Sequence, residues 1–117
     1  MSLLLDTPVA TPQDLTGRTV VVVHAHPDDE AIFTGATIRR LADHGARVVL
    51  VTATGGELGE PKVPLRGRTV GQLRTAELER AAELLGVARL VLLGRRDSGL
   101  PGWESGQHTR ALVRADL

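Results

Sequence analysis

The sequence predicts an α/β fold, with a mainly parallel, doubly wound sheet that carries helices on both faces. Short β-branched runs alternate along the chain with stretches of helical apolar spacing. The runs show no polar alternation, which is typical of strands buried on both faces. Their order along the 117 residues is strand, helix, strand, helix, strand, helix, and this length suits one domain. Such alternation favours right-handed crossovers and hence parallel strands.

The first half of the chain predicts two strands joined by a helix. Thr19–Val23 is the first β-branched run. Pro27 pushes the residue before it into extended geometry and suits a first helical turn, so a helix is expected over Asp28–Asp43. Gly45 is a typical helix stop, and Arg47–Ala53 is the second buried strand.

The second half begins with a segment rich in glycine and proline, Thr54–Arg68. A loop of that length in a compact domain is usually functional. The remaining elements are expected in this order: a helix over Val70–Leu85, a strand over Arg89–Leu93, a turn over Asp97–Gly102 and a last helix from Ser105 to about Asp116.

The composition limits the kinds of partner and site. Lys and Arg together number 14, as do Asp and Glu, and this balance favours neither nucleic acid nor an acidic membrane as partner. The absence of cysteine excludes thiolate ligands, so any metal would be held by imidazole and carboxylate. The first residues lack the basic segment of a signal peptide and the length of a membrane span, which predicts a cytoplasmic location.

Three polar residues follow the first strand, at the edge where such sheets bind ligands. His26 and Asp29 are three residues apart across a strand-to-helix turn, and both could reach one Zn²⁺ at roughly 2.0–2.2 Å. If Asp29 binds the metal, Asp28 can face the metal-bound water and take its proton. The alternative interpretation is a helix N-terminus with ordinary capping acids, whose charges complement the helix dipole.

These residues belong to a longer resemblance. Ala25–Glu30, which reads AHPDDE, resembles the signature of the PIG-L / LmbE-like deacetylases, the N-acetylglucosaminyl-phosphatidylinositol de-N-acetylase family. Thr54–Glu57, Arg74–Leu78 and Arg96–Leu100 resemble three further segments of that family, in the same order. The resemblance implies a Rossmann-like fold and zinc-dependent removal of an acetyl group from a small N-acetylated sugar conjugate, such as an N-acetylglucosamine conjugate.

Residue by residue, the resemblance implies His26 and Asp29 as zinc ligands, Asp28 as general base, and Arg74 and Asp97 in the substrate pocket. Glu57, beside two glycines, is a further candidate for substrate binding. Each of the last three has a simpler interpretation. Arg74 could pair with Glu77 on the helix surface, Asp97 could open a turn through its side chain, and Glu57 could be a solvated loop acid.

The other histidines do not complete a zinc site in the sequence. His24 is expected to be a core or supporting residue, His44 a partner of a helix C-terminus, and His108 a solvated residue of the last helix. The family's third zinc ligand is a histidine of an H-x-x-H-like segment further along. We therefore expect residues 1–117 to be one deacetylase domain truncated at its C-terminal end. The chain is then a catalytically incomplete fragment, a truncated gene product or one half of a split enzyme. The expected protein partners are a complementing C-terminal segment or further copies of the chain in a homo-oligomer.

Overall fold

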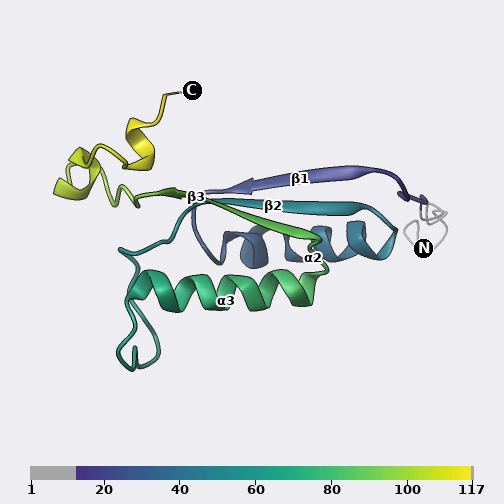
Figure 1. The fold of residues 1–117 in the computed structure, drawn as a ribbon, viewed down its shortest axis with the longest axis horizontal. Coiled ribbons are helices and arrows are strands. Elements are labelled where there is room, and N and C mark those ends of the chain that lie inside the picture. Colours follow the sequence, from purple (N-terminus) through teal and green to yellow (C-terminus); the bar gives the residue numbers. More distant parts are fainter. Residues whose placement is uncertain (1–12, 117) are drawn as a thin grey trace, which may run out of the picture.

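The computed structural model describes residues 13–116 and has the predicted alternation of strands and helices (Figure 1). Its elements are β1 (Thr19–His24), α2 (Asp29–Asp43), β2 (Arg47–Thr54), α3 (Val70–Leu85) and β3 (Arg89–Arg95), followed by the short 3-10 turns η1 (Glu104–Gln107) and η2 (Leu112–Arg114). Within this described part, no helix combines the length and apolar character that crossing a bilayer requires.

The three strands form a parallel sheet in the order β1-β2-β3. His24 pairs with Thr52 at the carboxyl end of β1, and Thr52 pairs in turn with Leu92 of β3. The predicted α/β class and parallel sheet are confirmed. Both helices lie on one face (Figure 1), as expected when consecutive strands are neighbours and the crossovers share one hand. A helix layer on the second face does not occur among residues 13–116.

The core lies between the sheet and this helix layer. Val48 and Leu50 of β2 are fully buried, and they pack in clusters with Ile38 of α2 and Leu78 of α3. Each such side chain contributes roughly 1.5–3 kcal/mol of burial free energy. The core thereby fixes where both helices start, and their starts lie at the carboxyl edge of the sheet.

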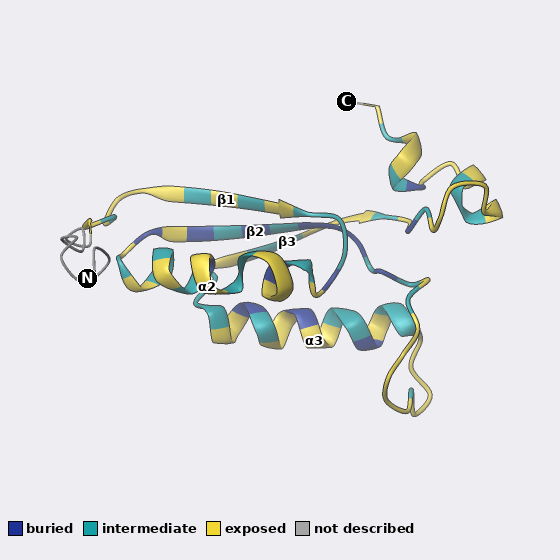
Figure 2. Ribbon diagram, turned by 180° about the vertical axis from the view of Figure 1, so that it is seen from behind, coloured by how far each residue is buried: buried dark blue, intermediate teal, exposed yellow. Residues whose placement is uncertain are grey.

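The opposite face of the sheet is open. Exposed and intermediate residues alternate along β1 (Figure 2). Val21 is 57% exposed and Val23 is 63% exposed, although both belong to the β-branched run that predicted burial on two faces. The strand register places three more valines on this face, and we call the five residues the open face: Val21, Val23, Val49, Val51 and Val91. Within the described residues, these strands are therefore covered on the helix face, and the predicted cover on the second face is not present.

The last predicted helix, from Ser105 to about Asp116, is wrong. The segment forms the two 3-10 turns, and between them Ala111 makes a bridge with Arg96. Arg96 donates its N–H to the Arg110 carbonyl at 2.9 Å and accepts from the Leu112 N–H at 2.9 Å. The backbone groups that a helix would need are thus used to extend the end of β3, and Gly106 weakens helix formation further.

Candidate active site

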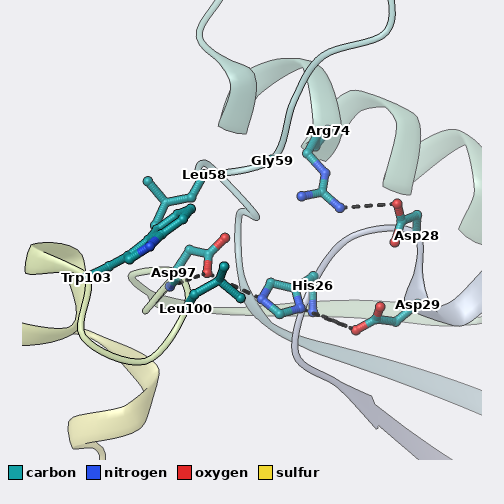
Figure 3. Close-up of a pocket in the computed structure, with 10 residues that line it drawn as sticks. His26, Asp28, Asp29, Leu58, Gly59, Arg74, Asp97, Leu100 and Trp103 are labelled. Carbon is teal, nitrogen blue, oxygen red and sulfur yellow. Dashed lines mark hydrogen bonds and ion pairs between the residues drawn. The ribbon is translucent and has the colours of Figure 1, made fainter.

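A cavity of about 370 Å³ lies at the carboxyl ends of the strands, in the size range of small-molecule sites. Its lining divides into two surfaces (Figure 3). The polar wall consists of His26, Asp28, Asp29, Arg74 and Asp97, and the apolar wall consists of Leu58, Leu100 and Trp103. The parallel sheet brings these residues together because it gathers the loops after all three strands at one edge.

His26 and Asp29 meet across the turn that joins β1 to α2. The Asp29 Oδ2 atom accepts the backbone N–H of His26 at 3.0 Å and lies 3.6 Å from the ring Nδ1. Asp29 is the first residue of α2, where the helix dipole favours a negative charge. The predicted proximity of these two residues is therefore present.

Asp97 approaches the same imidazole from the other side. Its Oδ1 lies 3.4 Å from His26 Nε2 and accepts the Gly99 N–H at 3.1 Å (Figure 3). Asp97 therefore opens a turn, as the simpler interpretation holds, and that turn also places its buried carboxylate against His26. The His26 ring lies between two carboxylates.

These distances suit two ligands of one metal ion but do not make a complete zinc site. Two ligands at about 2.0–2.2 Å from a tetrahedral ion lie roughly 3.3–3.6 Å apart. The separations of 3.6 Å from Asp29 and 3.4 Å from Asp97 both meet that condition. Catalytic zinc usually has three protein ligands, and residues 13–116 contain no group of three potential donors arranged around one point. The described residues fit zinc as a partial ligand set.

Asp28 does not cap the helix that it precedes. It occupies the N-cap position of α2 with φ of 90° and ψ of −23°, and its side chain makes no capping hydrogen bond. Its carboxylate is 58% exposed and lies 3.2 Å from Arg74 Nη2 (Figure 3). For Asp28, the interpretation as an ordinary capping acid is therefore wrong.

Arg74 joins the glycine-rich loop to the turn after β1. It donates from Nη1 to the Gly56 carbonyl at 2.8 Å and from Nη2 to the Pro27 carbonyl at 2.5 Å. A Cβ at Gly56 would lie 2.3 Å from Arg74 Nη1, so the loop needs glycine for this close approach. Among the ion pairs of residues 13–116, none joins Arg74 to Glu77, so the surface pair is not formed.

Glu57 faces a neighbouring cavity instead of the one that holds His26. Its Oε1 accepts the Asp97 N–H at 2.8 Å and lies 3.3 Å from Arg96 Nε. The carboxylate thus holds the backbone of the Asp97 turn. Substrate contact by Glu57 stays a prediction, and its observed contacts are structural.

The remaining histidines lie away from the cavity lining. His24 Nε2 is 3.0 Å from Thr34 Oγ1 in the layer between β1 and α2, and His44 Nδ1 is 2.8 Å from the Arg40 carbonyl at the end of α2. His108 accepts the Arg110 N–H at 3.0 Å at the end of η1. His24 and His44 have the supporting and helix-end positions that were expected.

The apolar wall was not among the expected site residues. Trp103 is the single tryptophan of the sequence and Leu100 ends the segment Arg96–Leu100 of the family resemblance, whereas Leu58 is an isolated apolar residue in a loop without a sequence signal. A Cβ at Gly99, where φ is +68°, would lie 2.5 Å from Trp103 Cε3 and 3.1 Å from Leu58 Cδ1. Glycine at this position allows the wall to close around the turn.

Glu30 has a sequence signal only as the last residue of the AHPDDE segment. It is 1% exposed, and its Oε2 accepts the Asp28 N–H at 3.0 Å. Burial raises the pKa of the Glu30 carboxyl from its ordinary value.

Comparison with known proteins gives the chain its relatives. The model of the PIG-L family, GlcNAc-PI de-N-acetylase, matches residues 21–115. A 1D-myo-inositol 2-acetamido-2-deoxy-alpha-D-glucopyranoside deacetylase of Salinispora arenicola is 45% identical over 88% of this chain and 37% of its own length. The deacetylase of the same description from Acidothermus cellulolyticus is 46% identical over 86% of this chain and 38% of its own length.

A solved structure has the same arrangement of elements. The N,N'-diacetylchitobiose deacetylase of Pyrococcus horikoshii superposes with a TM-score of 0.64 and 34% identity, over 86% of this chain and 37% of the other. The chain thus spans less than two fifths of the length of these relatives. The family match and the AHPDDE turn agree in position, and the chain belongs to the PIG-L family of GlcNAc-PI de-N-acetylases.

Proposed function

We propose that this chain supplies the AHPDDE half of a zinc-dependent N-deacetylase site that acts on an N-acetylglucosamine-type sugar conjugate. The observation that carries the proposal is the position of Asp28. Its side chain makes no capping hydrogen bond and lines the cavity beside the His26–Asp29 pair. An acid that only completed a helix cap would accept a backbone N–H of the first helical turn instead.

His26 and Asp29 would hold the zinc ion, which when bound supplies a water of lowered pKa and polarises the substrate carbonyl. Asp28 would take a proton from the attacking water while the oxygen of that water bonds to the acetyl carbonyl carbon. Asp28 would then donate that proton to the amide nitrogen as the carbon–nitrogen bond breaks, releasing acetate and the free amine. The turn that positions Asp28 keeps its carboxylate within the cavity for both transfers.

Arg74 and Asp97 would bind the polar side of the substrate. Both lie in the polar wall, and both side chains are largely buried, which limits competition from bulk water. The three residues of the apolar wall would contact the carbon–hydrogen face of a sugar ring, for which Trp103 offers an aromatic surface. The relatives support this substrate class, because their names describe the removal of acetyl from sugar conjugates.

The third zinc donor would come from a complementing C-terminal segment. Two observations support this: residues 13–116 contain no group of three donors, and the relatives that share this region are more than twice as long. A catalytically incomplete fragment is the rival interpretation. A cytoplasmic location and self-association through the open face stay predictions.

The test joins this chain to the region of the Salinispora arenicola deacetylase that follows the matched part. The chimaera should bind one zinc per chain and release acetate from an N-acetylglucosaminyl-inositol conjugate, and chelation should abolish the release. The 117-residue chain alone should hold well under one zinc, because two ligands do not make a catalytic site. A folded chimaera that binds zinc but deacetylates neither this conjugate nor N,N'-diacetylchitobiose would contradict the proposed function.

A further inference from the structure

Asp28 has a backbone conformation that few residues other than glycine adopt. It lies in the left-handed region at φ of 90°, which Asp tolerates better than most residues but still adopts uncommonly. Such conformations persist only where neighbouring groups over-determine them. Some contact must therefore hold this residue in place.

Two groups contact Asp28 from opposite sides. Arg74 reaches the carboxylate from the cavity, at 3.2 Å. Glu30 reaches the backbone from the interior, where its Oε2 accepts the Asp28 N–H at 3.0 Å. Glu30 is the more constrained of the two, because it is 1% exposed whereas the Arg74 side chain is 20% exposed. Its carboxylate satisfies the Asp28 N–H group at the partly buried start of α2.

Glu30 does not line the cavity, so it does not reach the substrate or the His26–Asp29 pair. The Thr34 hydroxyl donates to the Glu30 backbone carbonyl at 2.9 Å, and His24 Nε2 lies 3.0 Å from that hydroxyl. The polar groups of the β1–α2 layer thus engage the main chain of Glu30, whereas the carboxylate engages Asp28.

We propose that Glu30 is a positioning residue that sets the direction of the Asp28 carboxylate. By holding the Asp28 N–H inward, it places the side chain of the same residue outward over the cavity. This inference rests on the proposed function for its catalytic consequence, since Asp28 is the general base only if the chain is a deacetylase. The backbone effect can be measured without any activity.

The test compares Glu30→Gln, which keeps an oxygen acceptor of the same reach, with Glu30→Met, which has a similar volume and no oxygen acceptor. In NMR spectra of the 117-residue chain, a strong intraresidue HN–Hα NOE of Asp28 reports positive φ. It should persist in wild type and in Glu30→Gln and weaken in Glu30→Met. In the chimaera, Glu30→Met should lower kcat by at least about tenfold with KM within about twofold, because misplaced catalytic groups slow the chemical step. Glu30→Gln should retain most of the activity.

Thr34→Val is the matched control, because it removes a polar contact of the same layer without touching the Glu30 carboxylate, and it should leave the NOE and kcat unchanged. An unaltered Asp28 NOE and kcat in Glu30→Met would overturn the inference, as would equal losses in Glu30→Gln and Glu30→Met. If Glu30→Met does not fold, Glu30→Asp, one methylene shorter, replaces it with the same expectations. A wild-type chimaera without deacetylase activity would refute the proposed function alone, while the NOE comparison would still decide the role of Glu30.

Discussion

The two walls of the cavity are supported in different ways. The polar wall lies in the turn between β1 and α2, at the starts of α2 and α3 and in the turn after β3, and each of its side chains has at least one polar partner within the chain. The apolar wall stands on loops, and its residues are partly exposed: Leu58 by 40%, Trp103 by 48% and Leu100 by 62%. The polar wall is thus tied by hydrogen bonds and ion pairs, whereas the apolar wall is made of partly exposed side chains in loops.

This difference predicts that the two walls have different roles in catalysis and in substrate binding. Groups that act in the transition state need fixed positions, because catalysis by preorganised groups is lost when they move. Groups that contact the non-reacting part of a substrate contribute to binding and tolerate adjustment. Changes in the polar wall should therefore alter kcat, and changes in the apolar wall should mainly alter KM.

The largest effect is expected for Asp28→Asn in the chimaera. Loss of a general base lowers the rate by about 10²–10⁴-fold, and the amide keeps the size of the carboxylate. Zinc content should stay at the wild-type value, because Asp28 is assigned to the water and not to the metal. Acetate release and metal analysis on the same preparation measure both quantities.

Asp43→Asn is the matched control, because Asp43 lies at the other end of α2 in an exposed ion pair with Arg39. It should leave kcat near the wild-type value. Full activity of Asp28→Asn would show that another group is the base, and loss of zinc would show that Asp28 is a ligand.

A smaller effect is expected for Arg74→Lys. The guanidinium donates to two backbone carbonyls and to Asp28, and an ammonium lacks the planar fork that reaches all three. Hydrogen bonds of charged groups contribute about 1.5–3 kcal/mol, so kcat should fall roughly 10- to 100-fold.

Arg80→Lys, on the exposed side of the same helix, is the control and should leave kcat and KM unchanged. If Arg74→Lys raised only KM, Arg74 would be a substrate contact without influence on Asp28, and the polar wall would be less coupled than its contacts indicate.

The regular elements were predictable because their signals are local. The predicted helix Val70–Leu85 agrees with α3 at both ends, where Thr69 and Gln72 form a capping box and Gly86 adopts the left-handed conformation that ends it. The last helix was predicted from equally local spacing and failed. Its backbone partners lie on Arg96, and a pattern along one segment does not report bonds to another strand.

The site was predictable in composition and less so in arrangement. His26 and Asp29 are close in sequence, so their contact followed from the turn between them. The approach of Asp97 to His26 depends on parallel pairing of β1, β2 and β3, which the fold class implied without giving a distance. The left-handed Asp28 depends on a buried side chain and a distant arginine, and neither contact has a sequence pattern.

The smallest effect is expected in the apolar wall, for Trp103→Ala. Aromatic contacts contribute about 0.5–1.5 kcal/mol beyond their buried area, so KM for the sugar conjugate should rise about 2- to 12-fold while kcat stays within about twofold. Trp103→Phe should recover most of the loss, since it restores an aromatic face. Val113→Ala changes an exposed apolar residue outside the lining of this cavity, so it is the control and should alter neither constant. A kcat loss in Trp103→Ala as large as that of Arg74→Lys would remove the distinction between the walls, because the loop would then be positioning the reacting groups as well.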